Sequence, residues 1–125
     1  MEFDTQGALS QYQIEIGIKV ELNRLEELNA GLIYAARASA EAETAFKVAY
    51  AKARLNAKAQ GKITESTADD IATAETGELR LAYATTQNSL MASRENVSSC
   101  RAKLDALRTL SSSSRSASFI PSKRF

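Results

Sequence analysis

Residue types that commonly carry chemistry are absent or scarce in this 125-residue sequence. It has no histidine and no tryptophan, one cysteine, one proline, and five glycines that lie scattered along the chain. Without histidine, the commonest general base and metal ligand is missing. A single cysteine forms neither an intramolecular disulfide nor a metal site, and scattered glycines form no phosphate-binding loop. We therefore expect no enzyme activity, no cofactor, no metal and no small-molecule substrate.

Long apolar runs and net charge are missing too. The formal charge is +1, and no apolar stretch is long enough to cross a membrane or forms a secretory signal. We expect no membrane contact and a cytoplasmic location. The hydrophobic fraction is 44%, but much of it is alanine, so the core of one subunit should be thin. A thin core favours long helices packed side by side and a homo-oligomer.

Charge is present in blocks of alternating sign. Residues 1–33 hold six acids against two cations, and residues 63–96 repeat this balance. Residues 34–62 hold six cations against two acids, and residues 97–125 hold six cations against one acid. This alternation of charge is more informative about binding partners and charge pairing than the near-zero net charge is.

The most informative stretch is residues 44–62, which is alanine-rich and lacks acids. Alanine and lysine favour helix because they lose little side-chain freedom there. At about 100° per residue, Lys47, Arg54 and Lys58 share one helix face. Such a basic ridge suits a polyanion, because phosphates bind cations without a pocket. The alternatives are a solvated face or pairing with the acidic stretch 69–78. The candidate nucleic-acid-binding residues are Lys47, Lys52, Arg54, Lys58 and Lys62.

The N-terminal segment has two competing periodicities. Every even position from Tyr12 to Leu22 is apolar, which is typical of a strand. No second strand candidate appears, so we predict a helix over about 9–31, with a break or kink at Asn29 and Gly31. A strand that pairs between subunits is the alternative. The second periodicity is that of a helix, and the apolar residues that follow it are Ile14, Ile18, Leu22, Leu25, Leu28 and Leu32.

Two further helices are predicted downstream. The first begins at Leu32 or Ala35 and ends at Gln60, where Gly61, which is able to take the left-handed conformation, stops it. The next runs over 66–110, capped by Thr64, Ser66 or Thr67, with a bend possible at Gly77. The short connection between them indicates an antiparallel hairpin. The predicted fold class is all-α, a long helical hairpin with an additional N-terminal helix, oligomeric, in one domain over 1–110.

The last predicted helix carries an apolar seam whose spacing alternates between four and three residues, as in a coiled coil. We expect Cys100 in this seam to be a small core residue. A thin alanine-rich partner should not cover the whole seam, so part of it should be shared between subunits. The seam consists of Leu79, Tyr83, Thr86, Leu90, Ser93, Val97, Cys100, Leu104 and Leu107. The predicted oligomerisation residues are Leu90, Val97, Leu104 and Leu107.

The two ends of the chain are expected to be irregular. Residues 1–7 should be a frayed end. Residues 111–125 are serine-rich and should form a flexible basic tail, because the helical pattern stops and Pro121 forbids its continuation. This tail contains Arg115, Lys123 and Arg124 among apolar residues. It is either plainly disordered, an arm that contacts DNA phosphates, or an apolar hook that docks on a neighbouring subunit.

One run resembles a known family. Lys52-Ala53-Arg54-Leu55-Asn56 is similar to the Lys-Ala-Arg-Leu-Asp core of the UvsY-type recombination mediators of tailed bacteriophages. Lys47-Val48-Ala49 before it and Gly61 after it fall at similar positions, and the likeness extends in outline over about residues 40–110. Members of that family bind single-stranded DNA, assemble into rings, and help load a recombinase onto DNA coated by a single-strand-binding protein.

The resemblance implies a phage protein in the host cytoplasm whose partners are single-stranded DNA, a recombinase and a single-strand-binding protein. It implies that Lys52 and Arg54 contact DNA. The family's aromatic pair after the motif is replaced by Ala57 and Lys58, so backbone charge should be the main contact. The predicted function is a non-catalytic recombination mediator. The alternatives are a structural or assembly coiled-coil protein that binds no DNA, and an adaptor that docks a partner helix along the alanine-rich groove.

Overall fold

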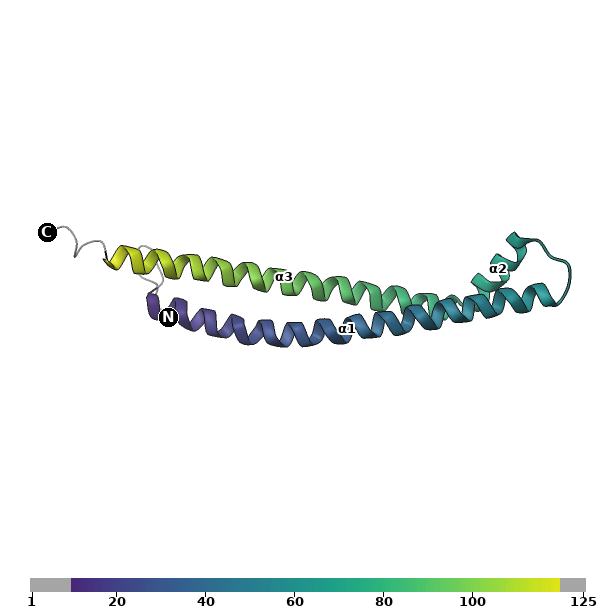
Figure 1. Ribbon diagram of the computed structural model, residues 1–125, viewed down its shortest axis with the longest axis horizontal. Coiled ribbons are helices and arrows are strands. Elements are labelled where there is room, and N and C mark those ends of the chain that lie inside the picture. Colours follow the sequence, from purple (N-terminus) through teal and green to yellow (C-terminus); the bar gives the residue numbers. More distant parts are fainter. Residues whose placement is uncertain (1–9, 120–125) are drawn as a thin grey trace. The chain divides into compact units, whose positions relative to one another are not determined.

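The computed structural model describes residues 10–119, and all of the secondary structure in this range is α-helical (Figure 1). The helices are α1 (Gln11–Ala59), α2 (Glu65–Glu75) and α3 (Gly77–Phe119). The predicted all-α class is confirmed. None of these helices combines the length and the hydropathy that a membrane span requires.

Helix α1 joins two segments that the sequence predicted as separate helices. It passes through Asn29 and Gly31 without interruption, so the predicted break is wrong. A helical glycine costs only about 1 kcal/mol relative to alanine, and a helix of 49 residues absorbs that cost. A Cβ at Gly31 would meet nothing within 4 Å, so no close packing requires glycine there. Within residues 10–119 the predicted N-terminal helix is accordingly part of α1 and not a separate element.

The alternating segment 12–22 lies inside α1, so the strand alternative is excluded. Its apolar residues divide between two faces: Ile14 is buried, whereas Tyr12 is 73% exposed. Leu22, expected on the packed face, is 42% exposed, and Glu21 is buried in its place. The reason is that packed positions alternate between steps of four and three residues. The step of four from Ile14 to Ile18 is followed by a step of three, which leads to Glu21 and not to Leu22. The Glu21 carboxylate lies 3.9 Å from both the Cys100 sulfur and the Lys103 ammonium.

Helix α2 has a well-defined start. The Thr64 hydroxyl accepts a hydrogen bond of 3.1 Å from the Thr67 backbone N–H, so Thr64 is the cap among the three candidates. Helix α1 ends at Ala59, one residue before the predicted end at Gln60, and Gly61 follows in the connection without adopting the left-handed backbone conformation. The chain turns there without it.

A break separates α2 from α3, where the sequence predicted one helix with a bend at Gly77. The break is at Thr76, one residue earlier. The Thr76 side chain is 3% exposed, and its hydroxyl donates a 2.7 Å hydrogen bond to the Ala72 carbonyl. The Thr76 backbone N–H donates to the same carbonyl at 3.1 Å. The residue at the break is therefore a buried threonine that is bonded to the preceding turn.

Helix α3 continues past Leu110 to Phe119, so the predicted helix end at Leu110 is wrong. Ser111 continues the four-three spacing of the seam and is 2% exposed. Its hydroxyl accepts a 2.9 Å hydrogen bond from the Gln11 side-chain amide of α1. Burial and this bond offset the modest helix propensity of serine. The predicted frayed end over 1–7, and the part of the predicted tail that contains Lys123 and Arg124, lie outside the described residues.

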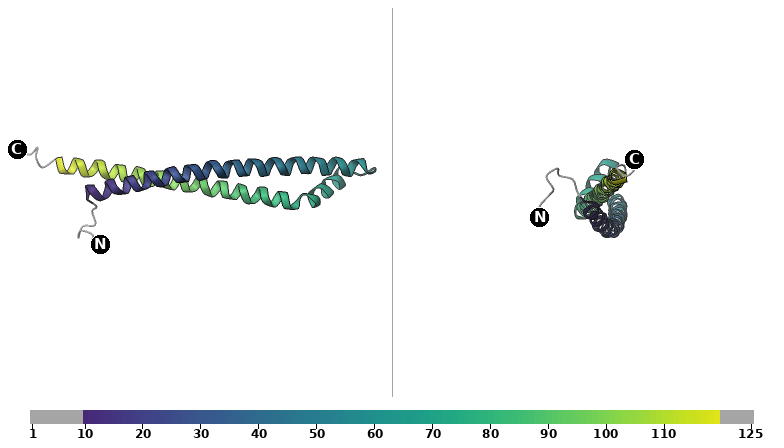
Figure 2. Two further views of the ribbon diagram at one scale, coloured as in Figure 1. Left: turned by 90° about the horizontal axis from the view of Figure 1, so that it is seen from below. Right: turned by 90° about the vertical axis from the view of Figure 1, so that its left-hand side faces the viewer.

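The chain divides into two compact units. Unit 1 comprises residues 1–30 and 95–125, and unit 2 comprises residues 31–94. In the described part of unit 1, the first half of α1 packs beside the second half of α3 (Figure 2). Contacts of Gln11 with Ser111 and of Glu21 with Cys100 show that the two segments run antiparallel. The buried apolar core of this unit is Ile14, Val97, Cys100 and Leu104.

Unit 2 contains the second half of α1, all of α2 and the start of α3. The Phe46 ring lies 6.0 Å from Tyr50 and 6.2 Å from Tyr83, measured between ring centroids, and the Arg80 guanidinium lies 4.7 Å above it. Beside α2 the core is made of small side chains, which let two helix backbones approach closely. The buried alanines are Ala53 and Ala57 on α1 and Ala68 and Ala72 on α2.

Burial along α3 follows the predicted seam. Val97, Cys100 and Leu104 are 2–3% exposed, whereas Leu79 is 37% exposed. The remaining predicted seam positions, from Tyr83 to Leu107, are half-buried. No large side chain of the described range is less than 2% exposed, which agrees with the expectation of a thin core.

Candidate nucleic-acid interface

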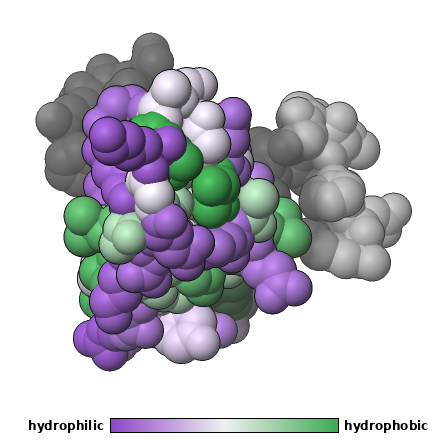
Figure 3. Space-filling view, turned by 90° about the vertical axis from the view of Figure 1, so that its right-hand side faces the viewer, coloured by the Kyte–Doolittle hydropathy of each residue, from purple (hydrophilic) through white to green (hydrophobic). Residues whose placement is uncertain are grey.

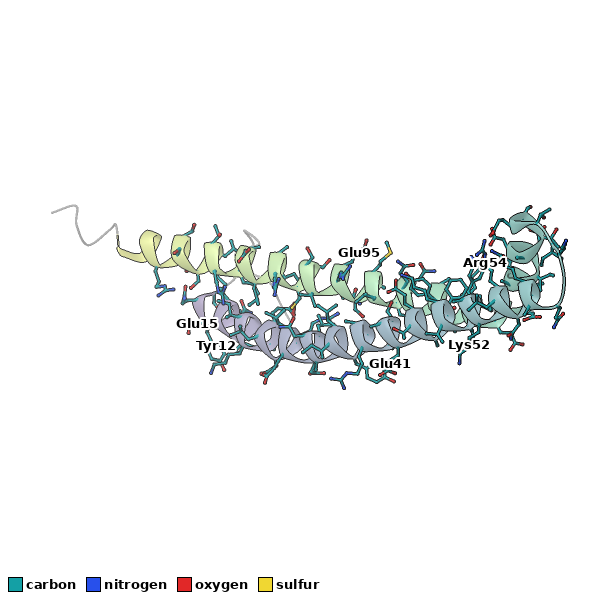
Figure 4. The ribbon with its side chains drawn as sticks, turned by 45° about the vertical axis from the view of Figure 1, so that its right-hand side comes forward. Tyr12, Glu15, Glu41, Lys52, Arg54 and Glu95 are labelled. Carbon is teal, nitrogen blue, oxygen red and sulfur yellow. The ribbon has the colours of Figure 1, made fainter. Side chains whose placement is uncertain are left out.

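The five predicted DNA-binding cations lie in unit 2, on the last turns of α1 and in the connection that follows. Arg54 points toward α2, whereas Lys52 lies on the opposite side of α1 (Figure 4). Two positions apart on a helix, these side chains are separated by about 200°. The motif that resembles the mediator family therefore presents its two cations to different surroundings.

Arg54 is engaged by acids of α2. Its Nε donates a 2.6 Å hydrogen bond to Asp69 Oδ1, and its Nη2 pairs with Glu65. Tyr50 donates its hydroxyl to the same Asp69 oxygen at 3.2 Å, and Lys58 pairs with Glu65. We call these five residues the α2 clamp. They connect the last turns of α1 to the first turns of α2 with two ion-paired cations and one phenol.

The electrostatics of the α2 clamp favour its charged form. The hydrogen bond from Arg54 lowers the pKa of Asp69 below its ordinary value, and the Tyr50 hydroxyl adds to this effect. Partial burial opposes both. The clamp carboxylates remain open to water, with the Glu65 side chain 66% exposed. Such exposed pairs are screened by solvent and exchange partners readily.

Lys47 is also paired within its own helix. Its ammonium lies 2.8 Å from the Glu43 carboxylate, four residues earlier. The hydrogen bond and charge of Lys47 lower the pKa of Glu43, and Glu43 raises the pKa of Lys47. All three cations of the predicted ridge face are thus paired with acids, as in the pairing alternative. Of the expected acidic partners Asp69 takes part, joined by Glu65 and Glu43.

Lys52 and Lys62 differ from the other three cations. Both are exposed, and neither forms an ion pair with any residue of the described range. Hydrophilic side chains cover much of the face shown in Figure 3, with hydrophobic side chains exposed between them. Lys52 and Lys62 are therefore the two predicted site residues that are free to bind an anion without breaking an existing contact.

The predicted oligomerisation residues lie mostly inside the chain. Val97 and Leu104 are buried in unit 1, Leu107 is half-buried there, and Leu90 is half-buried in unit 2. The Leu107 methyls lie 3.5 Å from where a Cβ at Gly17 would stand, so α1 covers this part of the seam. At Leu107, therefore, the chain's own first helix lies against the stripe.

A different apolar stripe is exposed in unit 1, and sequence reasoning missed it. Tyr12, Ile16 and Val20 lie four residues apart on α1 and are 73%, 43% and 56% exposed. Beside them a groove of about 440 Å³ is lined by Gly17, Val20, Glu21, Lys103, Ala106 and Leu107. The signal was present in the six even-numbered apolar positions from 12 to 22, four of which are exposed.

The described residues contain no group of three or more cysteines and carboxylates placed to hold a metal ion. Comparisons with protein-family models, with curated proteins and with solved structures give no match to this chain.

Proposed function

We propose that this protein is a single-stranded DNA-binding recombination mediator that helps to load a recombinase onto DNA coated with single-strand-binding protein. The observation that supports this proposal is the presence of two exposed cations without ion pairs, Lys52 and Lys62, at one end of α1. The resemblance of residues 52–56 to the mediator motif supports it as well.

In this proposal Lys52 and Lys62 contact phosphates directly. Lys47 joins them by exchanging Glu43 for a phosphate, since its side chain is 66% exposed. Arg54 and Lys58 hold α2 in place and shape the surface instead of forming the primary contact. Binding is electrostatic and insensitive to base sequence, because these side chains reach the strand's backbone.

A single subunit offers few phosphate contacts, so the proposal includes an oligomer of helical hairpins formed by α1 and α3. Repeating the site around an oligomer multiplies weak contacts through effective concentration. The exposed stripe of Tyr12, Ile16 and Val20 is the surface that we assign to a second copy, in place of the buried Val97 and Leu104. Exposed apolar side chains in one row are typical of such contacts.

An assembly coiled-coil protein that binds no DNA is the second candidate. The observation that favours it is that Lys47, Arg54 and Lys58 are each paired with an acid of the same chain. In this case Arg54 and Lys58 serve only to hold α2 on α1, Lys47 pairs within α1, and the exposed apolar stripe connects subunits.

Fluorescence anisotropy with labelled single-stranded DNA separates the two candidates. We expect Lys52→Gln with Lys62→Gln to weaken binding and to flatten the plot of log affinity against log salt by about 1.4 per subunit. Arg24→Gln with Arg37→Gln is the matched control, because it removes two other exposed cations of α1 and should change binding little. Absence of wild-type binding at low salt would favour the assembly protein.

A further inference from the structure

Within unit 2, the side of α1 that faces away from the packed core carries large apolar side chains. Ile33, Val48 and Leu55 are all exposed, Leu55 by 67%, and they lie within about 60° of one another around the helix. Ala53, which is buried against α2, lies on the opposite side of the same helix. We call the exposed side, over residues 33–55, the outer face of α1.

A groove of about 440 Å³ with an almost wholly apolar surface lies in the outer face. Its lining residues are Arg37, Ala40, Glu41, Thr44 and Ala45. The first four of them stand at the spacing i, i+3, i+4 and i+7, which surrounds the place where a facing helix inserts a side chain in coiled-coil packing. Val48 and Leu55, whose size suits such a place, belong to the same face. The outer face therefore carries both a groove and side chains that fit one.

One flank of the outer face carries an acid and a cation that have no ionic partner in the chain. Glu41 and Lys52 are exposed and point to the side of α1 opposite to Arg54 (Figure 4). Neither forms an ion pair with any residue in the range 10–119. They are separated by about three helical turns, or about 16.5 Å, so they stand nearly in line along the helix.

This face is complementary to itself in antiparallel pairing. A two-fold axis midway between Glu41 and Lys52 sets each Glu41 level with the Lys52 of the other copy, on the same flank of the contact. The same register sets Val48 and Leu55 of one copy level with the two ends of the groove of the other. Parallel pairing in register would instead set Glu41 against Glu41. Self-complementarity of this kind is what a closed two-fold contact requires.

We propose that the outer face of α1 binds a second copy of the chain, as an antiparallel pair in which α1 packs on α1. The occupant is a second copy because the groove, the side chains that fill it and both charges of the ion pair are all present on one face. The contact lies in unit 2 and is additional to the exposed stripe of unit 1. The inference goes beyond the proposed function and does not depend on DNA binding.

The pair also connects self-association with anion binding. Lys52 remains at the rim of the contact, where a phosphate competes with Glu41 of the second copy, as it competes with Glu43 for Lys47. Where Lys52 contacts DNA as proposed, DNA therefore weakens this contact, and the contact weakens binding at Lys52 by the same factor. Lys62 lies outside the outer face and is not affected.

Sedimentation velocity of the full chain at low salt, without DNA, tests the pair by charge reversal. All samples carry Ile16→Asp with Val20→Asp, so that the stripe of unit 1 does not contribute. Glu41→Lys places like charges at both ion pairs and should weaken association about tenfold, and Lys52→Glu should do the same. The chain with both reversals should return to within about twofold of the starting affinity. An equimolar mixture of the two single variants should associate more tightly than either variant alone.

Arg94→Glu and Glu95→Lys are the matched controls, because they reverse the same charges at exposed positions of α3. Alone or mixed, they should change association by less than about twofold. A starting chain that is monomeric at high concentration, an equal loss in the controls, or no recovery in the double reversal would overturn the inference. Should a reversal variant lose helix by circular dichroism, Leu55→Gln decides, since it changes only an exposed side chain and should weaken association. Unchanged association of Leu55→Gln would contradict the pair. Failure of the protein to bind DNA would overturn the proposed function and leave this inference standing.

Discussion

The guanidinium of Arg54 on α1 donates a 2.6 Å hydrogen bond to the carboxylate of Asp69 on α2, fifteen residues later in the chain. The same arginine is one that the family resemblance assigns to DNA contact. Arg54 therefore has a structural role here, and the adjacent Ala53 is buried. Lys52, the other cation of the motif, is exposed. A phosphate has to compete with two carboxylates for Arg54, but with none for Lys52.

Arg54 and Asp69 should be coupled in stability. We expect Arg54→Ala and Asp69→Ala each to lower the thermal midpoint by about 2–5 °C, since each leaves its partner without an ion pair. The double variant should lose less than the sum of the two, because the second change removes a group already unpaired. Thermal melts followed by circular dichroism provide the check. Strict additivity would mean that the pair does not interact in solution.

Acid should weaken the attachment of α2. The pKa of Asp69 is lower in the folded chain than its ordinary value of 3.8, so the pair contributes stability at pH values above 3.8. That contribution is lost as the pH falls from 3.8 through the lowered folded pKa. Compared with Asp69→Asn, the wild type should have the higher melting midpoint at neutral pH and no advantage in strong acid. A constant difference across this range would contradict the assignment.

Gly31→Ala should stabilise the protein by about 1 kcal/mol, because alanine is the better helix former and its methyl group meets no other atom within 4 Å. Urea denaturation measures this change. Gly17→Ala is the companion variant, whose methyl group would lie at ordinary contact distance, 3.5 Å, from Leu107. Destabilisation by Gly31→Ala would indicate that the helix breaks there after all.

Two apolar surfaces of unit 1 should respond differently to an introduced charge. Ile16→Asp with Val20→Asp changes exposed positions, so we expect folded protein of smaller oligomeric size. Leu104→Asp buries a charge in the core of unit 1 and should unfold it, since unpaired buried charges are costly. Light scattering with circular dichroism distinguishes these results. If Leu104→Asp gives smaller species that remain fully helical, the originally predicted stripe is the subunit contact.

Much of the fold could be predicted from periodicity. The four-three spacing of α3 correctly placed Val97, Cys100 and Leu104 on its packed face, because heptad spacing reports directly which face is packed. Helix ends were harder, since single residues such as Gly31 and Ser111 carry weak local preferences that tertiary contacts override. Leu22 was predicted on the packed face of α1 because it is hydrophobic. The four-three spacing instead places Glu21 on that face, and Glu21 is buried.

The candidate site was only partly predictable. The i, i+4 pair of Glu43 and Lys47 could be read from the sequence, whereas the partners of Arg54 depend on where α2 turns back. That turn rests on the Thr64 cap and on small side chains at the α1–α2 contact. Charge spacing therefore pointed to a row of cations but did not show which of them the chain itself neutralises.

The central claim, that this chain binds single-stranded DNA through backbone charge, is tested most directly by wild-type affinity measured against salt on two strands of unrelated sequence. The account predicts nearly equal affinities for both strands and a steep linear fall of log affinity with log salt, because counterions are released at each neutralised phosphate. Undetectable binding at low salt, or binding that is insensitive to salt, would contradict it.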